Sequence, residues 1–297
     1  IFIANLAATV VTLLMLLPEM NQSIWRFDNV IWRKMMVYAL PLMVAGLAGI
    51  TNETIDRILL QNLLPADISA SEIGLYSAFY KLSIIMTLFV QTFRFAAEPF
   101  FFSQEKERNA KQVYAQVMKY FSVVTAFIFL SVMIYYDVVK HFIGSSFHDE
   151  RGALIVPILL LANLFLGLYY NLSVWYKLTE KTQYGAYMSM LGATITVILN
   201  LVFIPHLGFV GSAWATLCCY FLMAVCSYFL GQKHYPIPYP LKRISLYFGL
   251  MLGFYFLSVY LSLGMGMNTL FLILYIVVVY VLEKPKKRVI SNPQLFD

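Results

Sequence analysis

The chain has 297 residues, of which 61% are hydrophobic and 12% are charged. An average soluble domain carries about a quarter charged residues, and a water-soluble fold could not bury this much apolar surface. The composition therefore excludes a soluble protein and predicts an all-α, polytopic transmembrane helix bundle. The formal net charge of +6 requires no nucleic-acid partner if the basic residues collect in loops that face anionic lipid.

Apolar runs recur along the whole chain. A helix needs roughly 20 mostly apolar residues to cross the ~30 Å hydrocarbon core of a bilayer. Nine runs meet or approach this length, so we predict about nine membrane-crossing helices. They cover residues 1–17, 35–62, 73–102, 113–136, 152–176, 185–204, 209–231, 244–263 and 269–283. The expected breakers between runs are Pro18, Pro65, the turn 205–208 and the prolines at 236, 238 and 240.

Basic residues alternate between the connections. The loops after the first, third, fifth and seventh runs, together with the tail, contain fifteen of the 21 Lys and Arg residues, and the other connections contain only Lys140 and Arg151. Cytoplasmic loops retain positive charge. We therefore predict that the tail, residues 284–297, is cytoplasmic and that the first helix enters from outside.

The first 34 residues carry two further signals. The chain begins at Ile1 and opens in apolar sequence without the basic region of a signal peptide, so we expect a fragment whose N-terminal part is missing. The segment 18–34 reads PEMNQSIWRFDNVIWRK and alternates aromatic and basic residues around Trp25 and Trp32. This pattern fits an amphipathic elbow on the cytoplasmic face, and it equally fits an ordinary connecting loop.

Ionisable residues inside the runs carry most of the functional information, because each costs at least ~2.5–3.5 kcal/mol at mid-bilayer. The second run contains Asn52, Glu53, Asp56 and Arg57 in the stretch TNETIDRILL. Glu53 and Arg57 are four residues apart and can pair on one helix face. Asn52 and Asp56 share a neighbouring face.

The third run contains a second polar set. Lys81 is the most nearly central lone charge and has no acid within helical reach on its own helix. Gln91, Arg94 and Glu98 follow spacings of three and four, so they form a polar stripe in which Arg94 and Glu98 can pair. In the fourth run, Lys119 lies close to the start and is expected to snorkel to the headgroups.

Two interpretations of these groups stay open. They can line a cavity between helices, where they meet an anionic substrate or carry a coupling proton or sodium ion. Alternatively, Glu53 with Arg57 and Arg94 with Glu98 are structural pairs that fix helix packing. The sequence shows no metal-ligand spacing, phosphate-binding loop or nucleophile with an assignable base. We therefore expect no enzyme activity and no cofactor beyond such a coupling ion.

Three stretches resemble a known family. AGITNETIDRILLQNLLP (48–65), GLYSAFYKLSIIMTLFVQTFRFAAEPFFF (74–102) and NLVFIPHLGFVGSAWATL (200–217) are similar to the C-terminal half of Wzx-type polysaccharide flippases. These belong to an exporter superfamily that also holds multidrug MATE transporters and lipid II flippases. Its members have two lobes of six helices around a cavity that opens alternately to each side.

The resemblance implies a domain arrangement. Residues 1–17 correspond to the last helix of a missing N-terminal lobe, 18–34 to the elbow, 35–231 to the C-terminal lobe, and 244–283 to a trailing helix pair. It also implies export of undecaprenyl-pyrophosphate-linked oligosaccharides, such as O-antigen or capsule precursors, across the bacterial inner membrane. The implied partners are that lipid-linked oligosaccharide, the membrane lipids and the missing lobe, without which the chain alone should not transport.

Site roles follow from the same resemblance, and two other functions stay open. Arg57 and Lys81 are expected to contact the pyrophosphate, while Glu53 and Asp56 tune them. The first alternative is a cation-coupled multidrug exporter of the same fold, in which the acids would lead. The second is a membrane-embedded transferase or polymerase, which would need a larger external loop than 137–151.

Overall fold

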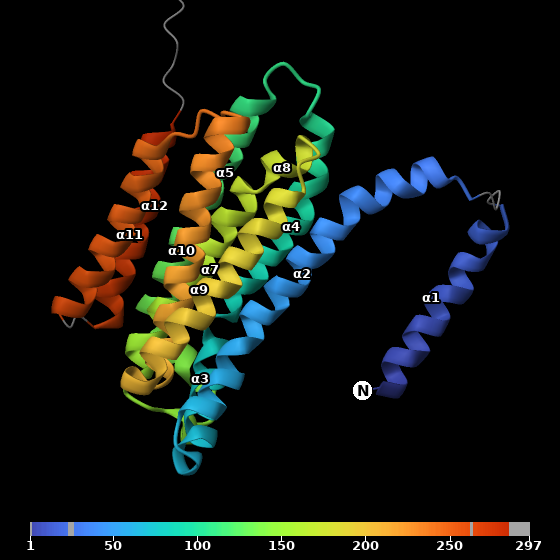
Figure 1. Cartoon of the computed structure of the whole chain (residues 1–297). Helices are drawn as coiled ribbons and strands as arrows, with labels where there is room; N and C mark the ends of the chain where they lie inside the picture. The colour runs from blue at the N-terminus through green and yellow to red at the C-terminus, as the bar shows by residue number, and fades with distance from the viewer. Residues whose placement is uncertain (1, 23–26, 262–263, 285–297) are drawn as a thin grey trace, which may run out of the picture. The chain divides into compact units, whose positions relative to one another are not determined.

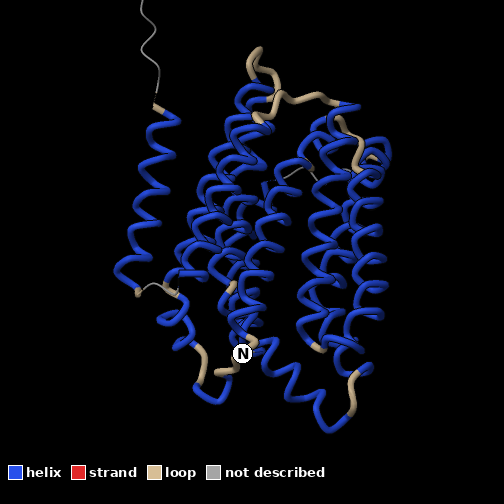
Figure 2. Tube along the Cα trace, turned by 90° about the vertical axis from the view of Figure 1, so that its left-hand side faces the viewer, coloured by secondary structure: helices blue, strands red, loops and turns tan. Residues whose placement is uncertain are grey.

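The computed structural model describes residues 2–22, 27–261 and 264–284. Every regular element in these ranges is a helix (Figure 2). Nine of the described helices are long and apolar enough to cross a membrane, which confirms the predicted all-α polytopic bundle. The elements are α1 (Phe2–Gln22), α2 (Asn29–Leu63), α3 (Ala66–Leu82), α4 (Ile84–Gln104), α5 (Ala110–Ile134), α6 (Tyr136–Val139), η1 (Lys140–Phe142), η2 (Ser145–Phe147), α7 (Gly152–Leu172), α8 (Val174–Leu178), α9 (Gln183–Leu207), α10 (Phe209–His234), α11 (Leu241–Leu261) and α12 (Met265–Glu283).

The chain divides into two compact units, Ile1–Leu40 and Pro41–Asp297. The first unit contains α1 and the start of α2. Pro18 lies inside α1 rather than after it, so its prediction as a breaker is wrong. Proline removes only one backbone hydrogen bond, and membrane helices tolerate that loss. Of the predicted elbow, Trp25 and Arg26 lie outside the described residues.

The start of α2 has a clear local cause. Asp28 accepts hydrogen bonds through Oδ1 from the backbone N–H groups of Val30, at 2.8 Å, and Ile31, at 3.2 Å. An aspartate in this position satisfies N–H groups that have no partner within the helix. The helix therefore begins at Asn29, inside the segment that the sequence assigned to the elbow.

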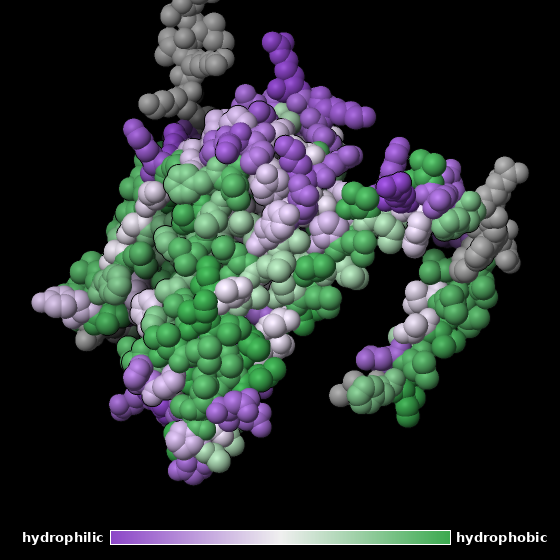
Figure 3. All heavy atoms as spheres, in the orientation of Figure 1, coloured by the Kyte–Doolittle hydropathy of each residue, from purple (hydrophilic) through white to green (hydrophobic). Residues whose placement is uncertain are grey.

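In the second unit, α7 is the central helix. It packs against α10, α4 and α5, and α10 packs in turn against α9 (Figure 1). The most apolar 18-residue window of the span Gly152–Leu178 is 78% buried, against 6% for that of Met265–Glu283. Figure 3 shows hydrophobic residues over the middle of this unit and hydrophilic residues gathered at its two ends. This distribution suits a bundle whose middle lies in lipid.

Two buried serines interrupt helices that the sequence predicted as continuous. The third predicted run, 73–102, is split at Ser83 into α3 and α4, and the fifth, 152–176, is split at Ser173 into α7 and α8. Each serine hydroxyl donates to the carbonyl three residues earlier, at 2.8 Å for Ser83 and 2.7 Å for Ser173. A serine that bonds back to the backbone competes with the helical hydrogen bonds and bends the helix.

The turn between α9 and α10 lies close to Glu72 of α3. Pro205, a predicted breaker, lies inside α9, and the chain turns instead at Gly208, where φ is 57° and ψ is −139°. Only glycine adopts this conformation without strain. A Cβ atom at Gly208 would lie 2.7 Å from Oε2 of Glu72, whose other carboxylate oxygen accepts a 2.7 Å bond from Arg151.

The last two helices, α11 and α12, pack on α5. Tyr275 of α12 donates to the backbone carbonyl of Val123 at 3.2 Å. Lys119 is 11% exposed and forms an ion pair with Glu283 at the end of α12. That Lys119 snorkels to the headgroups stays a prediction, and the structure adds that a carboxylate at the end of another helix meets its ammonium group.

Candidate functional site

A buried carboxylate joins four helices of the second unit. Asp56 of α2 is 2% exposed. It accepts hydrogen bonds from the Tyr76 hydroxyl of α3 at 2.8 Å, the Asn200 amide of α9 at 3.0 Å and the Thr216 hydroxyl of α10 at 3.0 Å. All three donors are neutral, so they stabilise the carboxylate without cancelling its charge.

Asn52 makes a second layer one turn away on the same face of α2. Its Oδ1 accepts from the Thr196 hydroxyl, and its Nδ2 lies 3.5 Å from Sγ of Cys219. That thiol donates to the Gly192 carbonyl at 3.3 Å. Asn52 and Asp56 share a helix face as the sequence predicted, and the structure shows that this face is turned toward α9 and α10.

Two buried side-chain oxygens on α9 and α10, the helices that contact Asp56, have no hydrogen-bond partner among the described residues. One is Oδ1 of Asn200, whose amide nitrogen already donates to Asp56 and to the Thr196 carbonyl. The other is Oγ of Ser212, one turn before Thr216 on α10. Buried polar atoms are normally satisfied. A carboxylate with a free amide oxygen and a free hydroxyl nearby is a set of oxygen ligands that suits a proton or a hard cation.

Of the two cations expected to meet a substrate, Arg57 extends from α2 onto α3, and Lys81 is a residue of α3. Arg57 is half-buried, its Nε donates to the Ser77 hydroxyl at 3.3 Å, and its guanidinium lies 5.4 Å from the ring centre of Tyr80. Lys81 follows Ser77 by one helical turn and is exposed. The two cations therefore lie near the same side of α3. The side chain of Glu53 is not among the described residues, so its pairing with Arg57 stays a prediction.

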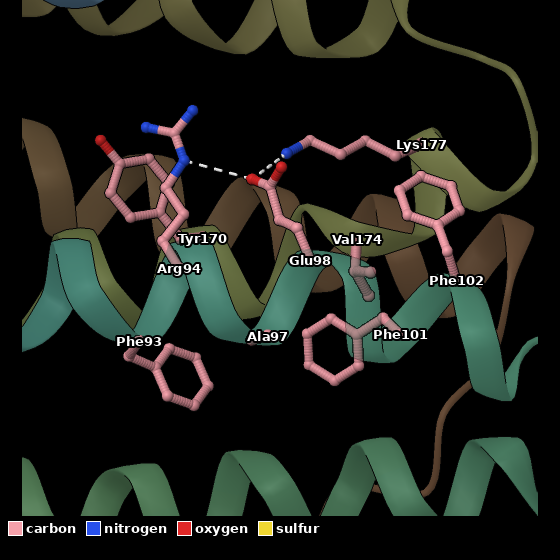
Figure 4. A pocket seen from close by; sticks show the side chains of 9 residues that line it. All are labelled: Phe93, Arg94, Ala97, Glu98, Phe101, Phe102, Tyr170, Val174 and Lys177. Atoms are coloured by element: carbon pink, nitrogen blue, oxygen red, sulfur yellow. Dashed lines mark hydrogen bonds and ion pairs between the residues drawn. The ribbon is translucent and has the colours of Figure 1, made fainter. Parts of the chain in front are cut away.

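The polar stripe of α4 forms a three-residue ion cluster (Figure 4). Glu98 accepts from Nε of Arg94 at 3.2 Å, as the spacing predicted, and from Nζ of Lys177 in α8 at 2.5 Å. The Arg94 guanidinium also lies 4.6 Å from the ring centre of Tyr170. Gln91 is half-buried on the same helix face. With two cations for one carboxylate, the cluster keeps a net positive charge.

The sequence did not predict several of these hydrogen-bond and ion-pair partners. Thr196 and Asn200 are polar residues four apart in a mostly apolar run, and that spacing places them on one helix face. Tyr76 and Thr216 carry no such signal, because tyrosine and threonine are common in membrane helices. Lys177 was assigned to a loop, and the structure places it in α8, where its Nζ pairs with Glu98 of α4.

Comparison with known proteins gives a fold. No protein-family model matches the chain, and no curated protein sequence matches it. Among solved structures it is similar to a chain described as "Lipid II flippase MurJ, inward closed conformation", with a TM-score of 0.60 and 14% identity. The match covers 88% of this chain and 57% of that chain. The helices are thus arranged as in a flippase-type fold, and this chain spans little more than half the length of its neighbour.

Proposed function

We propose that this chain is part of a transporter that flips undecaprenyl-pyrophosphate-linked oligosaccharides across the bacterial inner membrane. The observation that carries the proposal is the likeness to a lipid II flippase over 88% of the chain. The glycan is of the O-antigen or capsule type, as the Wzx-like sequence stretches imply. The partner is an N-terminal lobe, and the two lobes rock to expose a central site alternately to each side.

The anionic end of the substrate needs cations in the transport path. Moving a pyrophosphate out of water costs a large desolvation free energy unless charged donors meet it. Arg57 and Lys81 are the residues that we assign to this role. Arg57 is held in place by Ser77 and Tyr80, and Lys81 is exposed one turn further along α3. Arg57 reaches α3 from α2, so the two cations would lie near one side of α3 and could meet two phosphates in succession.

The coupling ion belongs at Asp56. The carboxylate accepts only neutral donors among the hydrogen bonds described for it, and Asn200, one of these donors, and Ser212, one turn from Thr216, carry unpartnered oxygens. This oxygen set fits a proton or a sodium ion. A bound cation would add positive charge that the three hydrogen-bond donors of Asp56 do not supply. Because Asp56 contacts α3, α9 and α10, a change in its charge would alter the packing of all three helices against α2.

Disruption at the native locus tests the proposal. Deleting the gene should remove surface polysaccharide and leave its lipid-linked precursor on the cytoplasmic face. Restoring the gene with Lys81→Ala should leave polysaccharide low at an unchanged protein level, whereas Lys181→Ala, at an exposed loop lysine, should restore it. Normal polysaccharide in the Lys81→Ala strain would remove Lys81 from the mechanism, and normal polysaccharide in the deletion strain would remove the function itself.

A cation-coupled multidrug exporter is the second candidate. The buried Asp56 favours it, since acidic residues would be the main functional groups of such a protein. Dye efflux by the deletion and restored strains, measured with and without a sodium or proton gradient, separates the two. Gradient-dependent efflux that returns with the gene, together with unchanged polysaccharide, would establish the drug exporter. Unchanged efflux with altered polysaccharide would establish the flippase.

A further inference from the structure

A recess opens at the end of the second unit where α5 meets the start of α11. Its volume is about 240 Å³. One wall is a polar stripe of α5, Gln112, Gln116 and Lys119, whose spacings of four and three place them on one helix face. The facing wall is Pro240 and Arg243 at the start of α11. Neither the proposed transport path nor the ion at Asp56 uses these residues.

The recess carries excess positive charge. Lys119 and Arg243 both pair with Glu283, and the Arg243 bond is 2.9 Å long. One carboxylate therefore compensates two cations. Arg243 remains half exposed, so part of its guanidinium is free to meet a ligand. The first turn of α11, which follows Pro240, adds the partial positive charge of a helix N-terminus.

The walls are fixed by the fold. Ile237, in the loop before α11, is 3% exposed, and its carbonyl accepts a 2.8 Å bond from the Gln232 amide of α10. Apolar surface adjoins the charged group as well. Leu246 follows Arg243 by three residues, so it lies on the same face of α11, and it is 44% exposed. A ligand at this recess meets cations and amides at one end and exposed leucine at the other.

We propose that this recess binds the phosphate of an anionic phospholipid, whose acyl chains lie along the exposed face of α11. Helix ends in a membrane bundle lie at headgroup depth, and basic pockets between helices at that depth suit lipid headgroups. Charge complementarity selects an anionic headgroup. The continuity of the recess with apolar surface selects a lipid over a free anion. A lipid bound at this site would affect how firmly α11 and α12 pack on α5.

Lipid titration of the purified chain in neutral detergent, followed by native mass spectrometry, tests this assignment. Phosphatidylglycerol should bind more tightly than phosphatidylcholine. Arg243→Gln should weaken phosphatidylglycerol binding about fivefold, the effect of one basic residue near a lipid surface. Lys242→Gln, at the exposed neighbouring lysine that does not line the recess, should leave binding unchanged. Glu283→Gln should strengthen binding, since it frees both cations from their carboxylate.

A second variant and a competitor keep the result decisive. Gln116→Glu is the substitute test if Arg243→Gln is unstable. It changes an exposed lining residue, so the variant should fold, and the added negative charge should weaken lipid binding. Excess inorganic phosphate should fail to displace the lipid. Displacement by phosphate would identify a free-anion site and overturn the lipid assignment. Equal binding of the two lipids, or unchanged binding in both Arg243→Gln and Gln116→Glu, would overturn the site.

Discussion

Asp56 and Glu98 are two carboxylates in one helical unit, and their surroundings differ in kind. Asp56 is 2% exposed and accepts from a tyrosine, an asparagine and a threonine. The Glu98 side chain is 36% exposed and accepts from Arg94 and Lys177. Asp56 contacts three other helices, whereas the Glu98 cluster connects α4 to α8.

The difference separates two uses of a charge within a membrane. Neutral donors stabilise a carboxylate but leave its negative charge in place, so Asp56 can still gain stability from an added cation. Glu98 already has more positive than negative charge around it, so an added cation gains nothing there. We therefore assign exchange of an ion to Asp56 and a fixed structural link to Glu98.

Replacing Asp56 by asparagine should have the largest effect. Asparagine keeps the size of the side chain and removes the charge that would hold the coupling ion. Coupling free energies of roughly 1–3 kcal/mol correspond to ~5–150-fold changes, so surface polysaccharide should fall at least several-fold. The matched control is Asp67→Asn, at an exposed carboxylate in the first turn of α3. Equal polysaccharide in the two variants would end the distinction between Asp56 and an ordinary surface acid.

Tyr76→Phe should have the second-largest effect, which is a loss of stability. The substitution deletes one hydroxyl, which donates to Asp56 at 2.8 Å, and preserves the buried ring. Hydrogen bonds to charged groups contribute about 1.5–3 kcal/mol, so the free energy of unfolding in detergent should fall by that amount. Tyr187→Phe, on an exposed ring, should change it by less than ~0.5 kcal/mol. A loss near zero at Tyr76 would mean that Asp56 does not depend on its neutral donors.

The sequence predicts the bundle well and the contacts of Asp56 poorly, for one physical reason. Hydrophobicity over 20 residues decides whether a helix crosses a membrane, and that quantity is local. The Asp56 cluster joins residues 20, 144 and 160 positions apart, and no local pattern links Asp56 with Asn200. The Arg94–Glu98 pair was predicted because both residues lie on one helix.

Helix breaks were the hardest local feature to predict. Proline was expected to end helices, yet Pro18 and Pro205 lie inside them. Two breaks lie instead at the buried serines Ser83 and Ser173, whose hydroxyls bond to the carbonyls three residues earlier. Serine is frequent in membrane helices, so its presence gives no warning that a helix will stop.

Glu98→Gln tests the fixed link and should cost less than the change at Tyr76. Arg94 and Glu98 are more than one third exposed, and solvent screens their attraction, so we expect a loss of about 1 kcal/mol. The loss should shrink as salt is raised, because added ions screen exposed charges. Glu105→Gln, at an exposed acid after α4, is the control. A larger, salt-independent loss would place Glu98 with Asp56 as a deeply buried charge.

A third carboxylate, Asp149, lies in the loop before α7, and its replacement should have the smallest effect on stability. Hydrogen bonds from Arg151, at 2.9–3.0 Å, hold the pKa of Asp149 below its ordinary value. A lowered pKa means that the folded chain binds this proton less tightly than the unfolded chain, so the stabilisation is complete above roughly pH 4. It is lost as the pH falls through the folded pKa.

Thermal unfolding of the native chain and of Asp149→Asn should therefore differ at pH 7 and converge below about pH 4. The difference at pH 7 should stay under ~1 kcal/mol, because the pair is partly exposed to solvent and Arg151 keeps its bond to Glu72. A difference that does not shrink as the pH falls from 4 through the folded pKa would show that Asp149 acts through loop geometry rather than charge. In that event Asp149 could not show how much the charge of a partly exposed acid contributes to stability, and the effect of the buried Asp56 would lack that comparison.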